Sequence, residues 1–215
     1  MKKMSKQTQA TLLALLAYFL WGFSFLFSRL GMDEAPPFVM LAHRFTLAAA
    51  AMASVLGVPA PVIRHTLMSF TGVEHRIEKT RVLEGVTYIN DSKGTNVDST
   101  IKAVQSMKAP TVLLLGGYDK HTDFMPLCRE IVASGQISHV VVMGETSKQI
   151  RTQLTEAGYD AITQAYSMQD AVEKARALAQ PGGNVLLSPA CASFDMFRDY
   201  EERGRIFKEI VAALN

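Results

Sequence analysis

The sequence predicts an α/β fold: a Rossmann-like, mostly parallel sheet with helices on both faces, preceded by a hydrophobic helical hairpin. Three observations lead to this prediction. After Gly72, short β-branched apolar runs alternate with amphipathic stretches at a spacing typical of strands and helices. Polar loops follow three of these runs. Residues 10–58, in contrast, are mostly apolar or small.

Four short apolar runs are predicted to be buried strands, because they are rich in β-branched residues and show no alternation of polar and apolar positions. They are Val86–Asn90, Thr111–Leu115, His139–Met143 and Asn184–Leu187. Five amphipathic stretches are predicted to be helices: Asp98–Met107, Phe124–Ala133, Thr146–Ala157, Met168–Ala179 and Phe197–Leu214. We expect the domain organisation to be a hydrophobic hairpin over residues 1–57, a connecting segment over 58–70 and the α/β domain over 71–215.

Charge and cysteine content exclude several classes of protein. The formal net charge is +2, and the basic residues are interspersed with acids, so no nucleic-acid partner is predicted. Acidic small molecules remain possible ligands. Cys128 and Cys191 are too few and too far apart for a disulfide framework or a zinc site, and we expect both to be reduced.

The stretch Ala10–Met32 is long and apolar enough to cross a membrane as a helix. Lys2, Lys3 and Lys6 precede it, which places the N-terminus in the cytoplasm by the positive-inside rule. The stretch is longer than the apolar region of a signal peptide. Phe38–Val58 is a weaker candidate span, because His43 and Arg44 interrupt it. If both segments cross, the hairpin returns the chain to the cytoplasm.

The residues LWGFSFLFSRLG and PPFVMLAHRF resemble the first two helices of the drug/metabolite transporter superfamily. Such transporters need about ten helices, often built as repeats. The sequence contains no further apolar span of that length, so transport by this chain alone is not expected.

Three polar loops are predicted to meet at the carboxyl edge of the sheet, where ligands bind in open α/β folds. The first is Asn90–Asn96 (NDSKGTN). Its Asp91 can accept hydrogen bonds from ribose hydroxyls, while Lys93 and Thr95 offer a cation and a hydroxyl to an anion. The same residues also suit a capped turn at the start of the next helix.

The other two loops are Gly116–Lys120 (GGYDK) and Ser188–Ser193 (SPACAS). The glycines allow close backbone approach, and Lys120 can pair with a carboxylate. Ser193 and the backbone amides near it can hold a carboxylate at the start of a helix. Arg76, just before the sheet, can clamp a phosphate, and its neighbour His75 is expected to be a packing or capping residue. The P-loop pattern G-x-x-x-x-G-K-[ST] does not occur.

Together, HR, NDSKGTN, GGYDK and SPACASFDMFRDYEERG resemble, in order and spacing, the C-terminal domain of the Mur ligases, and most closely the members that add D-glutamate. The resemblance implies that Arg76 and Asp91 contact the nucleotide. It implies that the incoming D-glutamate is bound by Lys93, Thr95, Lys120 and Ser193, with Tyr200 contributing through its backbone. Gly94 stands where alanine is frequent in the family, a change that is expected to be tolerated.

The resemblance also implies an ATP-dependent, amide-forming ligase reaction of peptidoglycan biosynthesis, and so a role in cell wall biogenesis, cell division and cell shape. In this family ATP phosphorylates the carboxylate of UDP-N-acetylmuramoyl-L-alanine, Mg²⁺ assists, and D-glutamate attacks the acyl phosphate. The P-loop and UDP-sugar domains are missing here, so we expect no complete catalytic set, no Mg²⁺ ligands and no turnover by this chain alone. The ligase domain is expected in the cytoplasm, tethered to the inner membrane if the hairpin inserts.

Two alternatives stay open. The stretch LAAAAMASVLGVPAPVIRHTLMSF also resembles the alanine-rich helix and turn that close the central domain of Mur ligases, which would place the seam near residues 46–57. The chain is then a gene fusion or an assembly product. Alternatively, it is a membrane-tethered binding or scaffold protein, or a transporter fragment fused to a ligase remnant.

Overall fold

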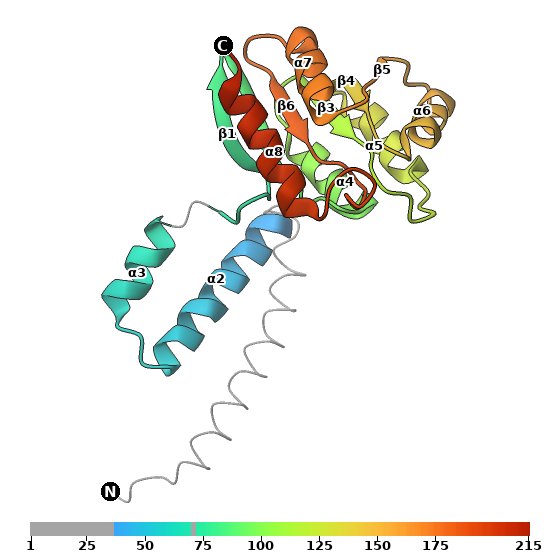
Figure 1. Ribbon diagram of the computed structural model, residues 1–215. Coiled ribbons are helices and arrows are strands. Elements are labelled where there is room, and N and C mark those ends of the chain that lie inside the picture. The colour runs from blue at the N-terminus through green and yellow to red at the C-terminus, as the bar shows by residue number, and fades with distance from the viewer. Residues whose placement is uncertain (1–36, 70–71) are drawn as a thin grey trace, which may run out of the picture. The chain divides into compact units, whose positions relative to one another are not determined.

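A computed structural model describes residues 37–69 and 72–215 (Figure 1). The chain divides into two units, Met1–Thr71 and Gly72–Asn215. The described part of the first is helical, and the second is an α/β unit.

The helical unit contains α2 (Pro37–Val55) and α3 (Ala60–Ser69). The helix α2 ends where Gly57 adopts a left-handed φ of 83°, and the amide of Val58 then bonds the carbonyl of Ala53 at 3.0 Å. Pro59 precedes α3, and its carbonyl accepts from the amide of Val62 at 2.9 Å. Apolar side chains on both helices are exposed, among them Leu47, Met52, Val55 and Met68.

The expected membrane hairpin gains no support. Its first segment, Ala10–Met32, lies outside the described residues. The second, Phe38–Val58, forms α2 and then turns at Gly57 instead of continuing as one helix. Among residues 37–69 and 72–215, no helix combines the length and the apolar character needed to cross a membrane. Alanine, which fills much of α2, contributes little apolar surface.

The α/β unit is a six-stranded sheet in the order β1-β2-β6-β3-β4-β5. Its strands are β1 (Glu78–Leu83), β2 (Val86–Asn90), β3 (Thr111–Leu115), β4 (Ile137–Val142), β5 (Ile162–Gln164) and β6 (Asn184–Leu187). Its helices are α4 (Val97–Ser106), α5 (Met125–Ser134), α6 (Ser147–Glu156), α7 (Met168–Leu178) and α8 (Tyr200–Ala213). The strand β1 is antiparallel to β2, and every other pairing is parallel. The predicted mostly parallel α/β fold is confirmed.

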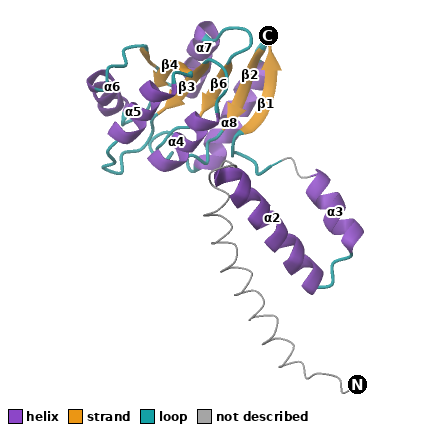
Figure 2. Cartoon of the chain, turned by 180° about the vertical axis from the view of Figure 1, so that it is seen from behind, coloured by secondary structure: helices purple, strands orange, loops and turns teal. Residues whose placement is uncertain are grey.

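Helices cover both faces of the sheet, with α4, α5 and α6 on one and α7 and α8 on the other (Figures 1 and 2). Alternate residues of β3 therefore enter different cores. Leu113 and Leu115 pack in the first core, whereas Val112 and Leu114 pack in the second. Because both faces are buried, the strand reads as a continuous apolar run instead of an alternating one.

Two edge strands were missing from the sequence prediction. The strand β1 has the sequence EKTRVL, and β5 is only three residues long. Edge strands are half covered and often polar, so the apolar pattern that identifies buried strands does not find them. The final helix was also predicted to begin too early, at Phe197. It begins at Tyr200 because the carboxylate of Asp199 caps it, accepting from the amide of Glu202 at 2.7 Å.

The close approach of β3 and β4 at their ends yields a test. Gly116 has a φ of 109°, and a Cβ built on it would lie 2.0 Å from the carbonyl oxygen of Met143. Gly116→Ala therefore combines backbone strain with a clash against main chain, and we expect a loss of about 4 kcal/mol or more in the free energy of unfolding.

The matched control is Gly158→Ala. Gly158 has a similarly left-handed φ of 87°, but nothing lies within 4 Å of its ideal Cβ. Only the strain term applies, at about 1–2 kcal/mol. Chemical denaturation measures both variants, and equal losses would show that the packing of Gly116 against Met143 is irrelevant.

Candidate functional site

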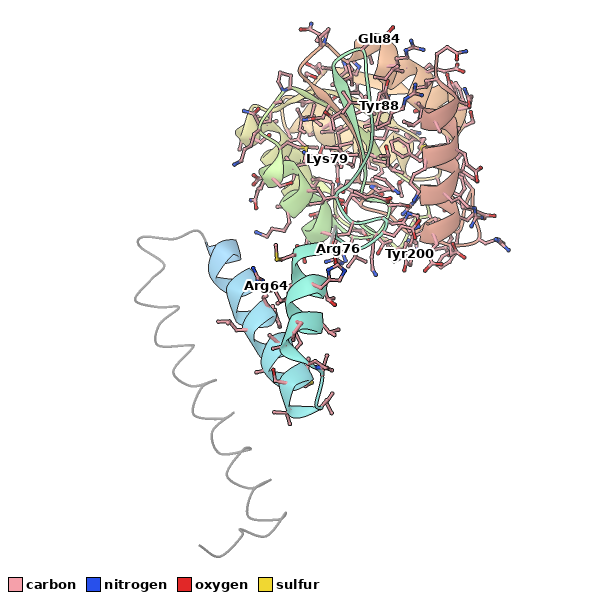
Figure 3. All side chains as sticks on the ribbon, turned by 90° about the vertical axis from the view of Figure 1, so that its left-hand side faces the viewer. Arg64, Arg76, Lys79, Glu84, Tyr88 and Tyr200 are labelled. Atoms are coloured by element: carbon pink, nitrogen blue, oxygen red, sulfur yellow. The ribbon has the colours of Figure 1, made fainter. Side chains whose placement is uncertain are left out.

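The loops that follow the parallel strands lie side by side, because β2, β6, β3 and β4 are neighbours in the sheet. The three predicted loops NDSKGTN, GGYDK and SPACAS follow β2, β3 and β6, so they do converge. We call this end of the α/β unit the carboxyl edge. Figure 3 shows Arg76 and Tyr200 at this end, opposite Glu84 in the turn between β1 and β2.

Asp91 lies inside the carboxyl edge and joins two of its loops. Its Oδ2 accepts from the hydroxyl of Ser188 at 2.6 Å, and its Oδ1 accepts from the amide of Ile77 at 3.2 Å. The side chain is only 4% exposed. Burial raises the pKa of this carboxyl, and the hydrogen bond from Ser188 partly opposes the rise. Asp91 therefore has a structural role, because it holds the NDSKGTN and SPACAS loops together.

Gly94 allows a close approach where the first loop packs against Ser188. An ideal Cβ at this position would lie 2.7 Å from Asp91 Oδ2 and 2.7 Å from Ser188 Oγ. This close packing explains why glycine is suited to this position. In this chain the absence of a side chain allows the close hydrogen bond between Ser188 and Asp91.

Arg203 of α8 is buried beneath these loops and was not predicted from the sequence. Its Nε donates to Ser92 Oγ at 2.9 Å and its Nη2 to the carbonyl of Ser92 at 2.8 Å. Its Nη1 donates to the carbonyls of Cys191 and Ala192 at 3.1 and 3.3 Å. Burial lowers the pKa of the guanidinium to about 10. One side chain therefore fixes the NDSKGTN loop against the SPACAS loop.

Lys93 and Tyr200 lie together at the surface of the edge. The Lys93 ammonium is 5.5 Å from the centre of the Tyr200 ring, a cation–π distance. The backbone carbonyl of Tyr200 accepts from the Ser92 hydroxyl at 2.7 Å, so this part of its backbone already has a partner. The Tyr200 hydroxyl donates to Glu201 at 3.0 Å.

Three predicted ligand-binding side chains keep their polar groups available. Within the described residues, no hydrogen bond or ion pair engages the hydroxyls of Thr95 and Ser193 or the ammonium of Lys120. Lys120 is exposed, Thr95 is half-buried and Ser193 is buried. The Lys120 and Ser193 loops are joined by an isolated bridge between Tyr118 and Ala192, with an N–O distance of 3.0 Å.

A fourth loop, Gly144–Thr146, follows β4 and was missed. Its sequence, GET, carries no motif that a single sequence would single out. The hydroxyl of Thr146 accepts from the amide of Gly117 at 3.1 Å, and Glu145 Oε2 accepts from the amide of Asp119 at 3.1 Å. The loop after β4 is thus an integral part of the carboxyl edge.

His75 and Arg76 have different environments. His75 is buried and left-handed (φ 63°), and its Nδ1 lies 2.9 Å from Asn90 Nδ2. The amide of Asn90 can only donate there, so Nδ1 is the acceptor. The predicted packing role of His75 is confirmed. The Arg76 side chain is exposed and available to a ligand.

Glu74, His75 and Glu78 place potential metal-ligand atoms within 4.8 Å of one another. However, the ammonium of Lys208 donates to Glu74 at 2.6 Å and to Glu78 at 3.0 Å. The Lys208 ammonium therefore already pairs with these two carboxylates, and the cluster is an ion-pair network. The described residues here do not fit a magnesium site.

Both cysteines are free and buried. Burial raises the pKa of the Cys191 thiol to about 11 and that of Cys128 to about 12. Thiols with such values are protonated at neutral pH, so neither has the character of a nucleophile. The Cys191 sulfur lies 3.3 Å from the Thr146 hydroxyl and contributes to packing.

A hollow of about 540 Å³ lies in the helical unit along Ala60, Pro61, Arg64, His65 and Met68. Its lining is mostly apolar, with Arg64 and His65 as its polar side chains. The polar groups suited to anion binding are at the strand ends instead.

Comparison with known proteins identifies the family. The description "Mur ligase, glutamate ligase domain" matches residues 75–191, which include NDSKGTN, GGYDK and most of SPACAS. The chain belongs to the Mur ligase family.

Curated relatives share the second part of the chain. It is 48% identical over 170 residues to the UDP-N-acetylmuramoylalanine--D-glutamate ligase of Thermoanaerobacter sp. (strain X514). It is 46% identical over 168 residues to the same ligase of Alkaliphilus oremlandii. Each match covers 78% of this chain and 37% of the relative. The chain thus spans little more than a third of these ligases.

The matched stretch is longer than the α/β unit. Residues 72–215 number 144, whereas the match to the Thermoanaerobacter ligase runs over 170 residues. The ligase similarity must therefore extend into the residues before Gly72. These matches give the transporter resemblance of the first fifty residues no support.

Solved structures share the fold. The UDP-N-acetylmuramate-alanine ligase of Thermotoga maritima superposes with a TM-score of 0.56 at 18% identity, covering 78% of this chain and 37% of that one. E. coli FolC in complex with ADP gives 0.54 at 19% identity, covering 83% of this chain and 40% of that one. At these identities the comparison shows the common fold alone.

The buried guanidinium yields a stability test. Arg203→Met keeps most of the side-chain volume but leaves the carbonyls of Ser92 and Cys191 without a donor, while the Ala192 carbonyl keeps only the amide of Tyr118. We expect a loss of about 3 kcal/mol in the free energy of unfolding, from denaturation curves. Arg205→Met, on the same helix with ion pairs of 3.9 Å, is the control and should cost less than about 0.5 kcal/mol. Similar losses in both variants would contradict a special role for Arg203.

The Lys208 network yields a pH test. Burial alone would raise the pKa of Glu78, but hydrogen bonds from the His75 amide and Lys208 lower it below 4.5. Burial alone would lower the pKa of Lys208, but its bonds to Glu74 and Glu78 raise it above 10.5. The contribution of Glu78 to folding stability is present above pH 4.5 and is lost as pH falls through its lowered pKa. The contribution of Lys208 is lost as pH rises through its raised pKa.

Lys208→Met should therefore lower the melting temperature most between these two limits. The difference from wild type should shrink at acid pH, as measured by thermal unfolding across a pH series. Lys148→Met, an exposed lysine of α6, should show no such dependence. A Lys208→Met difference that stays constant down to pH 2 would contradict the ion-pair explanation.

Proposed function

We propose that this chain carries the surface that binds D-glutamate and faces the nucleotide in a ligase adding D-glutamate to UDP-N-acetylmuramoyl-L-alanine. The observation that supports this most is the convergence, at one edge, of cations and hydroxyls that have no internal hydrogen-bond partner. The names and identities of the curated relatives support the choice of substrate.

The available groups match the chemistry of glutamate. Glutamate presents two carboxylates, and the carboxyl edge offers the ammonium groups of Lys93 and Lys120 with the hydroxyls of Thr95 and Ser193. Hydrogen bonds between cations and carboxylates are among the stronger ones in proteins. The cation–π contact with Tyr200 keeps Lys93 at the edge without neutralising its charge.

The nucleotide is proposed to lie toward Arg76 and Asp91. The exposed Arg76 guanidinium suits a phosphate. Both oxygens of Asp91 already accept one hydrogen bond, and each has a second lone pair for a ribose hydroxyl. A nucleotide contact by Asp91 would thus add to its role in holding the loops together.

The proposed contribution to the reaction is binding and orientation. ATP with Mg²⁺ would supply the phosphoryl group that activates the carboxylate of the UDP-linked substrate, and this chain's groups would hold the attacking amino acid. The sequence contains no P-loop motif, so we expect the chain alone to bind D-glutamate without forming an amide. The cytoplasm, where nucleotide precursors occur, is the proposed site of action. The seam of the ligase-like part is proposed near residues 46–57, since the similarity extends before Gly72.

The proposal is tested by NMR titration of the isotope-labelled full chain with D-glutamate. We expect saturable shifts at the NDSKGTN, GGYDK and SPACAS loops, with a dissociation constant of about 1 mM or weaker. Lys93→Ala and Lys120→Ala should each weaken binding about tenfold, because each removes a charged partner of a carboxylate.

Lys148→Ala, on α6, is the control and should bind as wild type. L-Glutamate should bind more weakly, because reversing the configuration at Cα displaces one of the three charged groups. An absence of any shift at these loops with D-glutamate at high millimolar concentration would refute the proposed function.

A further inference from the structure

The loop Gly144–Thr146 contributes no predicted ligand contact, yet it bonds to both neighbouring loops of the carboxyl edge. Three hydrogen bonds join Thr146 to Gly117. The Thr146 hydroxyl accepts from the Gly117 amide and donates to the Gly117 carbonyl, both at 3.1 Å, and the Thr146 amide donates to the same carbonyl at 3.1 Å. The hydroxyl also lies 3.3 Å from Cys191 Sγ. It is therefore shared between the Lys120 loop and the Ser193 loop.

Three carboxylates then connect the same loops in series, each accepting from a backbone amide of the next. Asp195 Oδ2 accepts from the Glu145 amide at 3.1 Å. Glu145 Oε2 accepts from the Asp119 amide at 3.1 Å. Asp119 Oδ1 accepts from the His121 amide at 2.6 Å. The series ends on the two residues that flank Lys120.

Close packing of the main chain also restricts how far apart these loops can lie. An ideal Cβ on Gly144 would contact Asp195 Oδ2 and lie 2.9 Å from the Cα of Gly117. An ideal Cβ on Gly117 would lie 3.0 Å from the Cβ of Cys191. The loops after β3, β4 and β6 therefore interlock at the main chain.

We infer that Thr146 and Glu145 are positioning residues of the D-glutamate subsite, which set the separation and orientation of Lys120 and Ser193. The inference rests on the proposed function and deepens it. Lys120 is exposed and has no partner among the described residues, so its own contacts do not fix its place. The bonds from Thr146 to Gly117 and from Glu145 to Asp119 fix the backbone on its N-terminal side. Small displacements of such groups weaken ligand binding strongly.

Two pairs of variants of the full chain test the hydrogen bonds of Thr146 and Glu145. One member of each pair removes the hydrogen-bonding atom, and the other keeps it. Thr146→Val replaces the hydroxyl by a methyl group, whereas Thr146→Ser keeps it. Glu145→Ala removes the acceptor for the Asp119 amide, whereas Glu145→Gln keeps an oxygen there. Thr152→Val, on α6 with only a local bond to Lys148, is the matched control.

D-Glutamate affinity is measured by NMR titration well below the unfolding temperature of each variant. We expect Thr146→Val and Glu145→Ala to weaken binding about tenfold, while Thr146→Ser, Glu145→Gln and Thr152→Val stay within about twofold of wild type. If folded Glu145→Ala and Thr146→Val both bind within twofold of wild type, the inference is wrong. If Thr146→Val does not fold, the Glu145 pair decides alone.

The amide signals of Lys120 and Ser193 without ligand separate this inference from the proposed function. In Thr146→Val they should move, and in Thr146→Ser they should return close to their wild-type positions. A wild-type chain that binds no D-glutamate would refute the proposed function, yet the same signals would still test the positioning of the loops. Signals that stay at wild-type positions in Thr146→Val and Glu145→Ala would overturn the inference.

Discussion

The arrangement of the carboxyl edge depends on the buried guanidinium of Arg203. It is 1% exposed, and its donors bond to Ser92 in the loop after β2 and to Cys191 and Ala192 in the loop after β6. A buried cation is costly unless its donors are satisfied. The two loops must therefore present their carbonyl and hydroxyl oxygens to the same point, and this requirement fixes the side chains that they carry outward.

The interior bonds of the edge divide its residues into two groups. Asp91, Ser92, Ser188, Thr146 and Arg203 direct their polar groups inward and hold loop to loop. Lys93, Thr95, Lys120 and Ser193 share the same loops, but their side chains make no hydrogen bond within the described residues. A rigid inner layer that supports available outer groups suits the binding of a small, doubly charged anion. Little side-chain and loop freedom then remains to be lost on binding.

The sequence predicted the four central strands, the five helices around them and the convergence of three loops. These features leave strong local patterns: apolar runs, helical periodicity and turn residues. The edge strands β1 and β5 were not predicted because one is polar and the other short. The roles of Arg203 and Thr146 were not predicted for another reason. Each acts through contacts with residues distant in sequence, 111 positions away for Ser92 and Arg203 and 29 for Gly117 and Thr146. An arginine within DYEERG looks like any exposed helical charge.

The place of β6 in the sheet has a consequence for how the protein is made. β6 (Asn184–Leu187) is inserted between β2 and β3, although it is the last strand in the chain. A nascent chain that has emerged only as far as α7 holds a β1–β2 hairpin and a β3–β4–β5 sheet with no strand between them. Both pieces then expose an unpaired apolar strand edge, which is a template for aggregation. The central core can close only after β6 leaves the ribosome and brings the SPACAS loop with it.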